Sequence, residues 1–407
     1  MKCGLLGRKL GHSYSPQIHA LLGNYSYQLF EKEPEEIGDF LKNGDFTGLN
    51  VTIPYKKEVI PFLDELSPAA ARLGAVNTIV RRDGKLIGHN TDYFGFRRLV
   101  QESGLQVAGK KVLVLGSGGA SSTAAAVLQE LGAKVTVISR SGENNYENLD
   151  RHADAAVIAN TTPVGMYPNT GKSALSLEGF PRLEGVLDAV YNPARTQILL
   201  DAERRGLAAV NGLWMLVAQA KESAEWFTGE EIPDSRIAKI HHTLRLQMEN
   251  IILIGMPGCG KTAVGQQLAQ KLGKKFVDAD ESLEARVCRK ITDIIPNDGE
   301  AAFREMESET LAELGKQSGL VIATGGGCVT QPQNYPLLHQ NGTIFWLKRE
   351  LDKLPTDGRP LSQKGTLGQM YEARMPLYLR FADAAISNDG SIAETASAIC
   401  RKLEETT

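Results

Sequence analysis

The chain has 407 residues, of which 42% are hydrophobic and 23% are charged, and this length predicts two or three compact units instead of one core. The formal net charge of −3 argues against nucleic acid or an anionic membrane as a partner. The first residues lack an apolar segment long enough for a signal peptide or a membrane span, and the five cysteines are scattered without metal-ligand spacing. We therefore expect a cytoplasmic protein with reduced thiols, whose oligomeric state the sequence leaves open.

The N-terminal part contains four polar segments, each of which ends or interrupts an apolar stretch. They are residues 12–16, 50–56, 74–78 and 88–92. Loops with such clusters of short polar side chains are expected where a small polyhydroxylated ligand binds. Taken singly, Lys56 and Asp92 would most often be a surface cation and a turn aspartate, so these segments alone leave the chemistry open.

A dinucleotide-binding pattern follows. Residues 110–115 predict a buried strand, the turn 116–121 (Gly-Ser-Gly-Gly-Ala-Ser) leads into an alanine-rich helix, and residues 134–138 predict the next strand. The glycines permit a tight turn and a close approach of the backbone to a pyrophosphate at the helix N-terminus, although Ser121 replaces the third glycine. The residues expected to contact the dinucleotide in this turn are Gly116, Gly118, Gly119 and Ala120.

The end of the second strand of this pattern indicates which dinucleotide binds. An NAD enzyme places Asp or Glu there for the ribose hydroxyls, whereas this chain has Ser139, Arg140 and Ser141. A guanidinium with flanking hydroxyls suits a 2′-phosphate, so the sequence favours NADP(H). The alternative is that Arg140 is an ordinary solvated loop residue.

Three further segments complete a family resemblance. Residues 160–166 (Asn-Thr-Thr-Pro-Val-Gly-Met), 187–193 (Leu-Asp-Ala-Val-Tyr-Asn-Pro) and 211–220 (Asn-Gly-Leu-Trp-Met-Leu-Val-Ala-Gln-Ala) follow the preceding motifs in the chain. Together, in order and spacing, the motifs resemble shikimate dehydrogenase over residues 1–247. The resemblance implies an α/β substrate-binding domain at 1–97, completed by helices at about 213–247, and a Rossmann-like NADP domain at 98–212.

The same resemblance implies roles for single residues. Lys56 and Asp92 would form the catalytic pair, because an ammonium can stabilise and protonate the ketone oxygen of 3-dehydroshikimate while a carboxylate orients that ammonium. The residues implied in substrate binding are Ser13 and Ser15 at the carboxylate, Thr52, Asn77 and Gln219 at the ring oxygens, and Tyr191. One departure is Trp214, which stands where the family usually has glycine close to the nicotinamide.

A phosphate-binding loop opens the second half of the chain at residues 255–262 (Gly-Met-Pro-Gly-Cys-Gly-Lys-Thr). An apolar strand is predicted at 250–254 and a helix at 263–272, which is the context that this motif requires. A glycine-rich loop without these flanks would usually be only a tight turn. The residues that would hold ATP and Mg²⁺ are Gly258, Gly260, Lys261, which reaches the terminal phosphate, and Thr262, which binds the metal.

Further motifs follow this loop. Residues 276–280 (Phe-Val-Asp-Ala-Asp) predict a strand that carries Asp278 and Asp280 on one side. The other motifs lie at residues 299–307, 323–327, 358–361 and 374–378. Each has an ordinary explanation as a turn, a loop or a solvated helix charge. Jointly with the phosphate-binding loop they resemble shikimate kinase across residues 250–407, which implies a P-loop α/β domain of the nucleoside-monophosphate-kinase type.

The kinase resemblance implies that Arg304 and Arg374 grip the shikimate carboxylate with forked hydrogen bonds, and that Asp280 accepts the proton of the attacking hydroxyl. Asp278 would support magnesium through water, and backbone amides around Gly326 would face the substrate.

Two departures concern the kinase motifs. Arg359 would balance the charge on the transferring phosphoryl group from a closing lid, but the stretch from Leu347 to Arg374 is shorter than the family's lid. Ile295 stands where the family often has phenylalanine.

The sequence as a whole predicts a bifunctional α/β enzyme that reduces 3-dehydroshikimate with NADPH and phosphorylates shikimate with ATP. One alternative is a regulatory or ligand-sensing protein on the same folds; another is a quinate/shikimate dehydrogenase with NAD preference fused to the kinase. We also expect that Cys259, inside the phosphate-binding loop, is either a reactive thiolate or a buried inert thiol.

Overall fold

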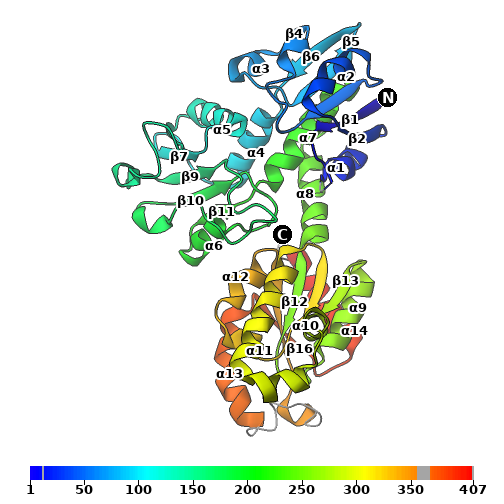
Figure 1. Cartoon of the computed structure of the whole chain (residues 1–407), viewed down its shortest axis with the longest axis vertical. Helices are drawn as coiled ribbons and strands as arrows, with labels where there is room; N and C mark the ends of the chain where they lie inside the picture. Colours follow the sequence, from blue (N-terminus) through cyan, green and yellow to red (C-terminus); the bar gives the residue numbers. More distant parts are fainter. Residues whose placement is uncertain (12, 355–366, 406–407) are drawn as a thin grey trace. The chain divides into compact units, whose positions relative to one another are not determined.

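The computed structural model describes residues 1–11, 13–354 and 367–405. Its contacts divide the chain into two compact units. Unit 1 comprises residues 1–165, 172–191 and 198–243; unit 2 comprises residues 166–171, 192–197 and 244–407. Each unit is an α/β structure with its own sheets, drawn in Figure 1.

Unit 1 begins with a mixed sheet of strand order β2-β1-β3-β5-β6-β4. In this sheet β1 runs parallel to β2 and β3, whereas β5 is antiparallel to both β3 and β6. The strands are β1 (Lys2–Gly7), β2 (Ser26–Glu31), β3 (Gly48–Val51), β4 (Glu65–Leu66), β5 (Thr78–Arg82) and β6 (Lys85–His89), and the helices are α1 (Ser15–Leu22), α2 (Ile37–Asn43) and α3 (Pro68–Leu73). Buried aliphatic side chains such as Leu6, Leu49 and Ile79 form the core under this sheet.

A second sheet in unit 1 is entirely parallel, with strand order β11-β10-β9-β7-β8. Its strands are β7 (Lys111–Leu115), β8 (Lys134–Ile138), β9 (Val157–Asn160), β10 (Gly185–Asp188) and β11 (Ala208–Val210), with helices α4 (Asp92–Glu102), α5 (Gly119–Glu130), α6 (Gln197–Arg204), α7 (Leu213–Thr228) and α8 (Ser235–Met248). The predicted strand-turn-helix-strand at residues 110–138 is confirmed. Helix α7 returns to the first sheet, packing along α4 and against α1.

Unit 2 is built on one parallel sheet of order β13-β14-β12-β15-β16. Its strands are β12 (Asn250–Ile254), β13 (Lys275–Asp278), β14 (Leu320–Ala323), β15 (Gly342–Lys348) and β16 (Ala384–Ser387). Its helices are α9 (Lys261–Leu272), α10 (Ala279–Val287), α11 (Ile291–Lys316, interrupted at Gly299), α12 (Asn334–His339), α13 (Leu367–Phe381) and α14 (Ile392–Glu405). The central strand β12 is fully buried, as its run of apolar residues predicts.

One local prediction is wrong. Strand β13 ends at Asp278 and α10 begins at the next residue, so Asp280 lies on a helix and not on the same side of a strand as Asp278. The cause is capping: the Asp278 carboxylate accepts the backbone N–H of Asp280 at 3.0 Å and that of Glu281 at 3.5 Å, which starts the helix.

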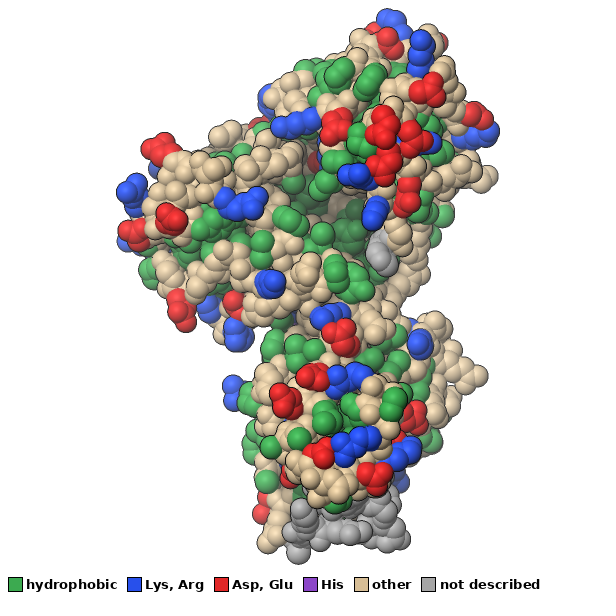
Figure 2. All heavy atoms as spheres, viewed as in Figure 1, with side chains coloured by type: hydrophobic (Ala, Val, Ile, Leu, Met, Phe, Trp, Pro, Cys, Tyr) green, Lys and Arg blue, Asp and Glu red, His purple; other side chains and the backbone are tan. Residues whose placement is uncertain are grey.

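The distribution of charged side chains on the surface is consistent with the small net charge of −3. On the face in Figure 2, basic and acidic side chains occur on both units. Over the described ranges, no helix combines the length and the apolar character that crossing a membrane would need.

Candidate active sites

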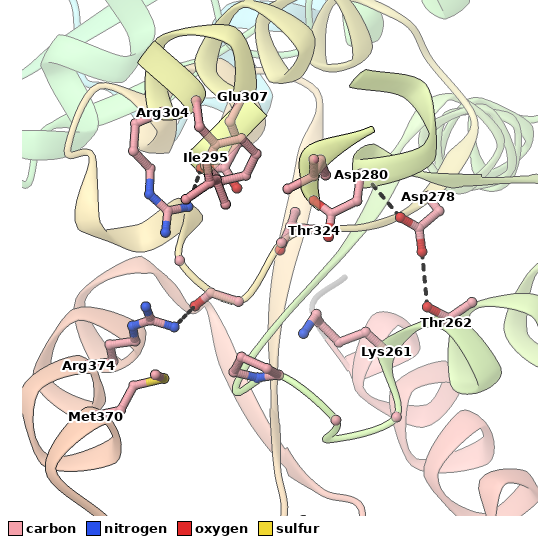
Figure 3. A pocket seen from close by; sticks show the side chains of 18 of the residues that line it. Lys261, Thr262, Asp278, Asp280, Ile295, Arg304, Glu307, Thr324, Met370 and Arg374 are labelled. Atoms are coloured by element: carbon pink, nitrogen blue, oxygen red, sulfur yellow. Dashed lines mark hydrogen bonds and ion pairs between the residues drawn. The ribbon is translucent and has the colours of Figure 1, made fainter. Parts of the chain in front are cut away.

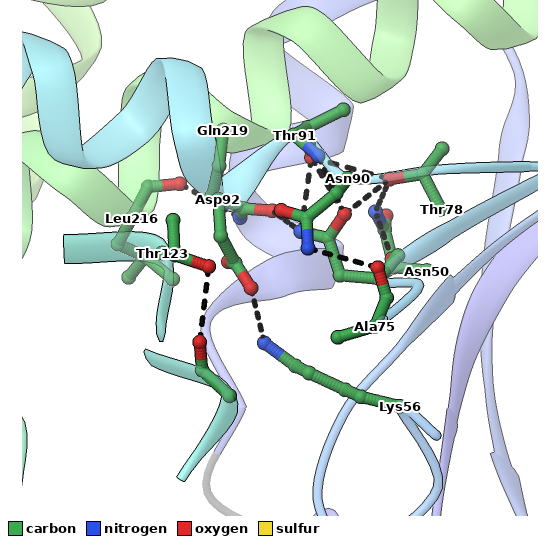
Figure 4. A network of polar contacts seen from close by, with 12 residues as sticks. Asn50, Lys56, Ala75, Thr78, Asn90, Thr91, Asp92, Thr123, Leu216 and Gln219 are labelled. Carbon is green, nitrogen blue, oxygen red and sulfur yellow. Dashed lines mark hydrogen bonds and ion pairs between the residues drawn. The ribbon is translucent and has the colours of Figure 1, made fainter. Parts of the chain in front are cut away.

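A lysine–aspartate pair lies in unit 1 at the start of α4. Lys56 Nζ donates to Asp92 Oδ2 at 2.5 Å, and the side chains are 22% and 10% exposed (Figure 4). Asp92 is in the first turn of α4, where the unpaired N–H groups of the helix favour a negative charge. The pair therefore joins an ammonium that is still accessible to a carboxylate that is held in place.

This lysine faces a cavity of ≈780 Å³ that also reaches the dinucleotide turn. The residues predicted to contact the dinucleotide all line it: Gly116, Gly118, Gly119, Ala120, Ser139 and Arg140. A Cβ at Gly116, where φ is +118°, would lie 2.9 Å from Thr161 Oγ1, so this position requires glycine. Ser121, which replaces the expected third glycine, donates its hydroxyl to Gly116 O at 2.7 Å and closes the turn from inside.

Arg140 is exposed at the rim of this cavity, beside the half-buried Tyr146. Burial raises the pKa of Tyr146, and the guanidinium of Arg140 partly opposes that rise. Ser139 N donates to Asn144 O at 3.1 Å, which folds residues 139–146 into a compact loop. Tyr146 belongs to no motif in the sequence, so only the structure brings it to the cavity.

The predicted amide ligands Asn77 and Gln219 meet although they lie 142 residues apart. Asn77 Nδ2 donates to Gln219 Oε1 at 3.4 Å and to Thr91 Oγ1 at 3.0 Å, while Asn77 Oδ1 accepts Thr91 N at 2.7 Å. Thr91 directly precedes Asp92, so the amides are tied to the segment that carries the carboxylate of the lysine–aspartate pair (Figure 4).

The remaining predicted ligands of unit 1 lie on loops and on the first turn of α1. Ser13 Oγ accepts Ser15 N at 3.2 Å, and Ser15 is buried. Tyr191 packs edge-on against Tyr14 with ring centroids 6.1 Å apart, which brings it next to the two serines. Burial raises the pKa of Tyr191 to about 12. Thr52 is half-buried and follows β3, with its N–H donating to Leu6 O at 3.0 Å.

Trp214, which stands where the family usually has glycine, packs against a histidine. Its ring stacks on His241 of α8 at a centroid distance of 3.7 Å, and the Arg98 guanidinium lies 5.8 Å from the ring. The tryptophan therefore fastens α8 to α7 and α4.

The phosphate-binding loop of unit 2 lies between β12 and α9, which begins at Lys261. It borders a cavity of ≈420 Å³ with Gly258, Gly260, Lys261 and Thr262 in its lining. Lys261 Nζ donates to Gly255 O at 2.9 Å and Met256 O at 3.1 Å, so it lies folded over the loop. Gly260 has a left-handed conformation, and a Cβ there would lie 2.5 Å from Asn388 Nδ2.

Cys259 does not face this cavity. Its side chain is fully buried in the hydrophobic core of unit 2, and a Cβ at Gly255 would lie 2.9 Å from its sulfur. The buried-thiol alternative therefore holds, because a residue with no exposed surface is not available to oxidants or alkylating reagents.

The acidic residues of the cavity lie at the start of α10. Thr262 Oγ1 donates to Asp278 Oδ2 at 3.0 Å, and Asp280 lines the same cavity (Figure 3). Burial, together with the nearby carboxylates of Glu307 and Asp278, raises the pKa of Asp280 to about 6. This carboxyl group can therefore exchange a proton close to neutral pH.

Two arginines approach this cavity from different helices. Arg304 of α11 donates from Nη1 to Glu307 Oε2 at 2.8 Å and from Nη2 to Glu300 Oε1 at 3.2 Å, which leaves its buried Nε without a hydrogen-bond partner. Arg374 of α13 donates to Gly326 O at 3.2 Å. In Figure 3 the two arginines lie on one side of the pocket, away from Thr262.

Sequence reasoning assigned no role to Glu307, although it is 2% exposed and lines this cavity. Burial raises its pKa, and the Arg304 guanidinium opposes that rise. The available signal was its spacing, since Glu307 follows Arg304 by three residues on a helix, where the two side chains are neighbours. Ile295 also lines the cavity, whereas Arg359 and the other residues of the 355–366 stretch of the expected lid lie outside the described residues.

The fold and these two sites define a dinucleotide-binding α/β unit with a lysine–aspartate pair, joined in one chain to a P-loop unit. The family model for the shikimate dehydrogenase substrate binding domain matches residues 5–79, and that for shikimate kinase matches residues 257–404. The chain belongs to the shikimate dehydrogenase family and carries a shikimate kinase domain, so it combines two enzymes of the shikimate pathway.

Individual relatives support this assignment. A shikimate dehydrogenase (NADP(+)) of Clostridium perfringens is 37% identical over 264 residues, which cover 60% of this chain and 97% of the relative. The crystal structure of shikimate dehydrogenase 1 from Peptoclostridium difficile is 38% identical with a TM-score of 0.56, covering 60% of this chain and 98% of that one. A structure from Thermus thermophilus, in complex with NADP(H) and shikimate, is 30% identical with a TM-score of 0.54, covering 60% of this chain and 99% of that one.

Substitution of Gly327 is expected to be destabilising, since a Cβ at this position would lie 2.2 Å from Arg304 Nη2, on a buried guanidinium held by two ion pairs. Gly327→Ala should destabilise the chain by about 1–3 kcal/mol, because the buried guanidinium must move and its ion pairs are disturbed. Denaturant unfolding measures this change. Gly368→Ala is the control: a Cβ there meets nothing within 4 Å, and this helical position should be unchanged or slightly stabilised. Equal stability of the two variants would contradict the expectation.

Proposed function

We propose that the chain catalyses two successive reactions: NADPH-dependent reduction of 3-dehydroshikimate to shikimate, and ATP-dependent phosphorylation of shikimate to shikimate 3-phosphate. The observation that carries the proposal is that, in each unit, a glycine-rich loop and charged side chains suited to the transfer line one cavity. These side chains are Lys56 and Arg140 in unit 1, and Lys261, Asp280, Arg304 and Arg374 in unit 2. Residues 1–97, with the helices at about 213–247, would bind the first substrate, residues 98–212 NADP(H), and residues 250–407 ATP and shikimate.

The residues of unit 1 fit a dinucleotide phosphate. A Cβ at Gly118 would meet nothing within 4 Å, so the absence of a side chain leaves open space beside the N-terminus of α5 for an anion. Arg140 and Ser139, which line the same cavity after β8, would hold the 2′-phosphate. When bound, NADPH supplies the hydride.

Lys56 and Asp92 would perform the proton chemistry of the reduction. The Lys56 ammonium donates a hydrogen bond to the ketone oxygen, stabilises the charge that develops on it, and transfers the proton. Asp92 orients this ammonium through the 2.5 Å contact. Ser13, Ser15 and Tyr191 would fix the carboxylate end of the substrate, and Thr52, Asn77 and Gln219 its ring oxygens.

The side-chain oxygens of Thr262 and Asp278 in unit 2 are suitable ligands for Mg²⁺. Among the residues that the structure describes, no three His, Cys, Asp or Glu side chains gather into a metal cluster. Mg²⁺ usually takes only one or two protein ligands beside phosphates and waters, so the Thr262–Asp278 pair is a suitable partner. The bound metal neutralises charge on the phosphates.

The protein side chains would do the rest of the phosphoryl transfer. Arg304 and Arg374 hold the shikimate carboxylate, and backbone amides around Gly326 face the substrate. Asp280, in its ionised form, accepts the proton of the attacking hydroxyl. Lys261 would leave the loop carbonyls for the terminal phosphate, and Gly258 and Gly260 allow the loop to wrap around it. The role suggested for Arg359 stays a prediction.

A ligand-sensing protein with inactive sites is a weaker proposal, because the chain retains Lys56, Lys261 and Asp280 in the cavity linings and Asp92 in contact with Lys56. A quinate-type, NAD-linked first reaction is disfavoured by Arg140, since an acidic residue suited to ribose hydroxyls is missing after β8.

The two activities should be separable by single substitutions, because each cavity contains its own charged groups. Lys56→Ala should abolish dehydroshikimate reduction and leave phosphorylation of added shikimate near normal; Lys261→Ala should do the reverse. NADPH consumption and ADP formation are followed separately on the purified chain. Loss of both activities in either variant, with the fold intact by circular dichroism, would refute independent sites.

Arg140 should determine the use of NADPH. Arg140→Asp is expected to raise the KM for NADPH at least tenfold, because a charge-assisted contact to a phosphate contributes about 1.5–3 kcal/mol, towards the lower end at an exposed site. Arg182→Asp serves as the control, since it is an exposed arginine that does not line the cavity. If both variants use NADPH like the parent, Arg140 does not bind the 2′-phosphate.

Kinase activity should depend on the ionisation of Asp280. Because the raised pKa of about 6 belongs to a base that must be ionised, kcat/KM should be constant above this pH and fall about tenfold per pH unit below it. The measurement uses both substrates well below saturation. Carboxyl NMR of the parent should show a titration near pH 6 that is missing in Asp280→Asn; a flat rate profile down to pH 5 would contradict this assignment.

A further inference from the structure

A buried cluster of polar side chains lies behind the predicted amide ligands of unit 1. We define this polar cluster as Asn50, Thr78, Thr91 and Ser223, which are between 0% and 5% exposed. They come from β3, β5, the residue before α4, and α7. The cluster thus ties β3, β5 and α7 to the start of α4, the helix that carries Asp92. Asn50, Thr78 and Thr91 are labelled in Figure 4.

Ser223 is the centre of this cluster. Its hydroxyl lies 2.8 Å from Gln219 O, 2.8 Å from Asn50 Nδ2, 2.8 Å from Thr78 Oγ1 and 3.0 Å from Thr91 Oγ1. A carbonyl oxygen can only accept, so the single Ser223 proton goes to Gln219 O. The serine oxygen then accepts from Asn50 Nδ2. Each threonine hydroxyl can donate either to this oxygen or to Asn77 Oδ1, so Ser223 fixes the direction of its own bonds to Gln219 and Asn50.

The orientation of the neighbouring amides follows from the same reasoning. Asn77 Oδ1 must face the N–H of Thr91, so Nδ2 is the atom that points to Gln219. Gln219 then accepts at Oε1 and donates from Nε2 to Leu216 O at 2.9 Å, with a second Nε2 hydrogen left over. The bond from Asn77 to Gln219 is long at 3.4 Å and can be replaced by a ligand oxygen.

Asn50 holds the strand side of this arrangement. Its Oδ1 accepts the Tyr27 hydroxyl at 2.7 Å, so its Nδ2 must point to Ser223, at 2.8 Å, and to Asn77 O, at 3.4 Å. Asn50 and Ser223 are 173 residues apart in the sequence, and neither of them lines the cavity at the dinucleotide turn. Their contacts act on the backbone of the two residues that carry the amides, Asn77 and Gln219.

We propose that Ser223 and Asn50 are positioning residues of the dehydrogenase, which hold Asn77 and Gln219 so that both present amide N–H groups to the ring hydroxyls of shikimate. This inference rests on the proposed function of unit 1 and adds a specificity determinant to it. A buried network of this kind acts through satisfied hydrogen bonds, because each unpaired member would cost more than the bond it loses.

The test is Ser223→Ala, measured as shikimate oxidation with NADP⁺ by the full chain. The KM for shikimate should rise about five- to tenfold, with a smaller change in kcat, because the amides lose their orientation while Lys56 and Asp92 keep theirs. The same assay is run with the two monodeoxy analogues of shikimate that retain the 3-hydroxyl. For the analogue that lacks the hydroxyl bound by Asn77 and Gln219, Ser223→Ala should raise the KM only slightly.

Thr228→Ala is the matched control. Thr228 also lies on α7 and donates its hydroxyl to the carbonyl four residues earlier, at 2.9 Å, but it is outside the polar cluster. Thr228→Ala should leave the kcat and the KM unchanged for shikimate and for both analogues. NADP⁺ binding, measured by fluorescence without turnover, and kinase activity should equal those of the parent in both variants.

The outcomes distinguish the inference from the proposed function. If the parent does not oxidise shikimate with NADP⁺, the proposed function of unit 1 fails. If the parent is active but Ser223→Ala loses activity equally for shikimate and both analogues, or loses nothing, the positioning role is overturned. Should Ser223→Ala not fold, Thr78→Val tests the same cluster at a fully buried position, with the same expected pattern.

Discussion

Both cavities depend on one constraint: backbone N–H groups at the start of a helix must come close to an anion. In unit 1 the turn between β7 and α5 satisfies it with Gly116, which has no room for a Cβ, and Gly118, which would point a Cβ into open space. In unit 2 a Cβ at Gly255 would lie 2.6 Å from Leu347 O, and one at Gly260 2.5 Å from Asn388. A side chain at Gly116, Gly255 or Gly260 would displace the loop, and one at Gly118 would occupy the open space beside the helix N-terminus, so the shape of both loops depends on these glycines.

The parts of the sites that the sequence predicted are those whose chemistry requires a residue type at a fixed spacing. The two glycine loops and the parallel sheets beneath them belong to this class, and so do Lys56, Arg140, Lys261 and Asp280, which line the two cavities. Local spacing also has limits: Asp278 and Asp280 are two residues apart, which fits one side of a strand, but the capping bond of Asp278 makes the second residue helical. The pattern alone does not distinguish these two geometries.

What the sequence did not predict arises from contacts between distant segments. Ser223 and Asn50 are hydrogen-bonded although they lie 173 residues apart, and no motif beside either residue predicts this contact. Tyr146 lies at its cavity on a loop after β8 that is folded by its own hydrogen bonds, among them Ser139 N to Asn144 O. Cys259 illustrates the reverse case, since its position in an anion-binding loop suggests reactivity while packing turns the sulfur into the core. Burial is a property of the whole fold and cannot be derived from the loop.

The charges in the P-loop cavity are better explained by function than by stability. Arg304 and Glu307 are 6% and 2% exposed, and a buried ion pair seldom repays the cost of removing both charges from water. The pair leaves Arg304 Nε and Glu307 Oε1 buried without hydrogen-bond partners, so its bonding capacity is incomplete. Glu307 also raises the pKa of Asp280, which a purely structural pair would not need to do. An anionic ligand that bound Arg304 would compete with Glu307 for the guanidinium, which would leave the Glu307 carboxylate less neutralised and would raise the pKa of Asp280 further. A magnesium ion at the Thr262–Asp278 pair would have the opposite effect, because its positive charge favours the ionised form of Asp280. The carboxylate ligand and the metal would therefore act on the pKa of this base in opposite directions.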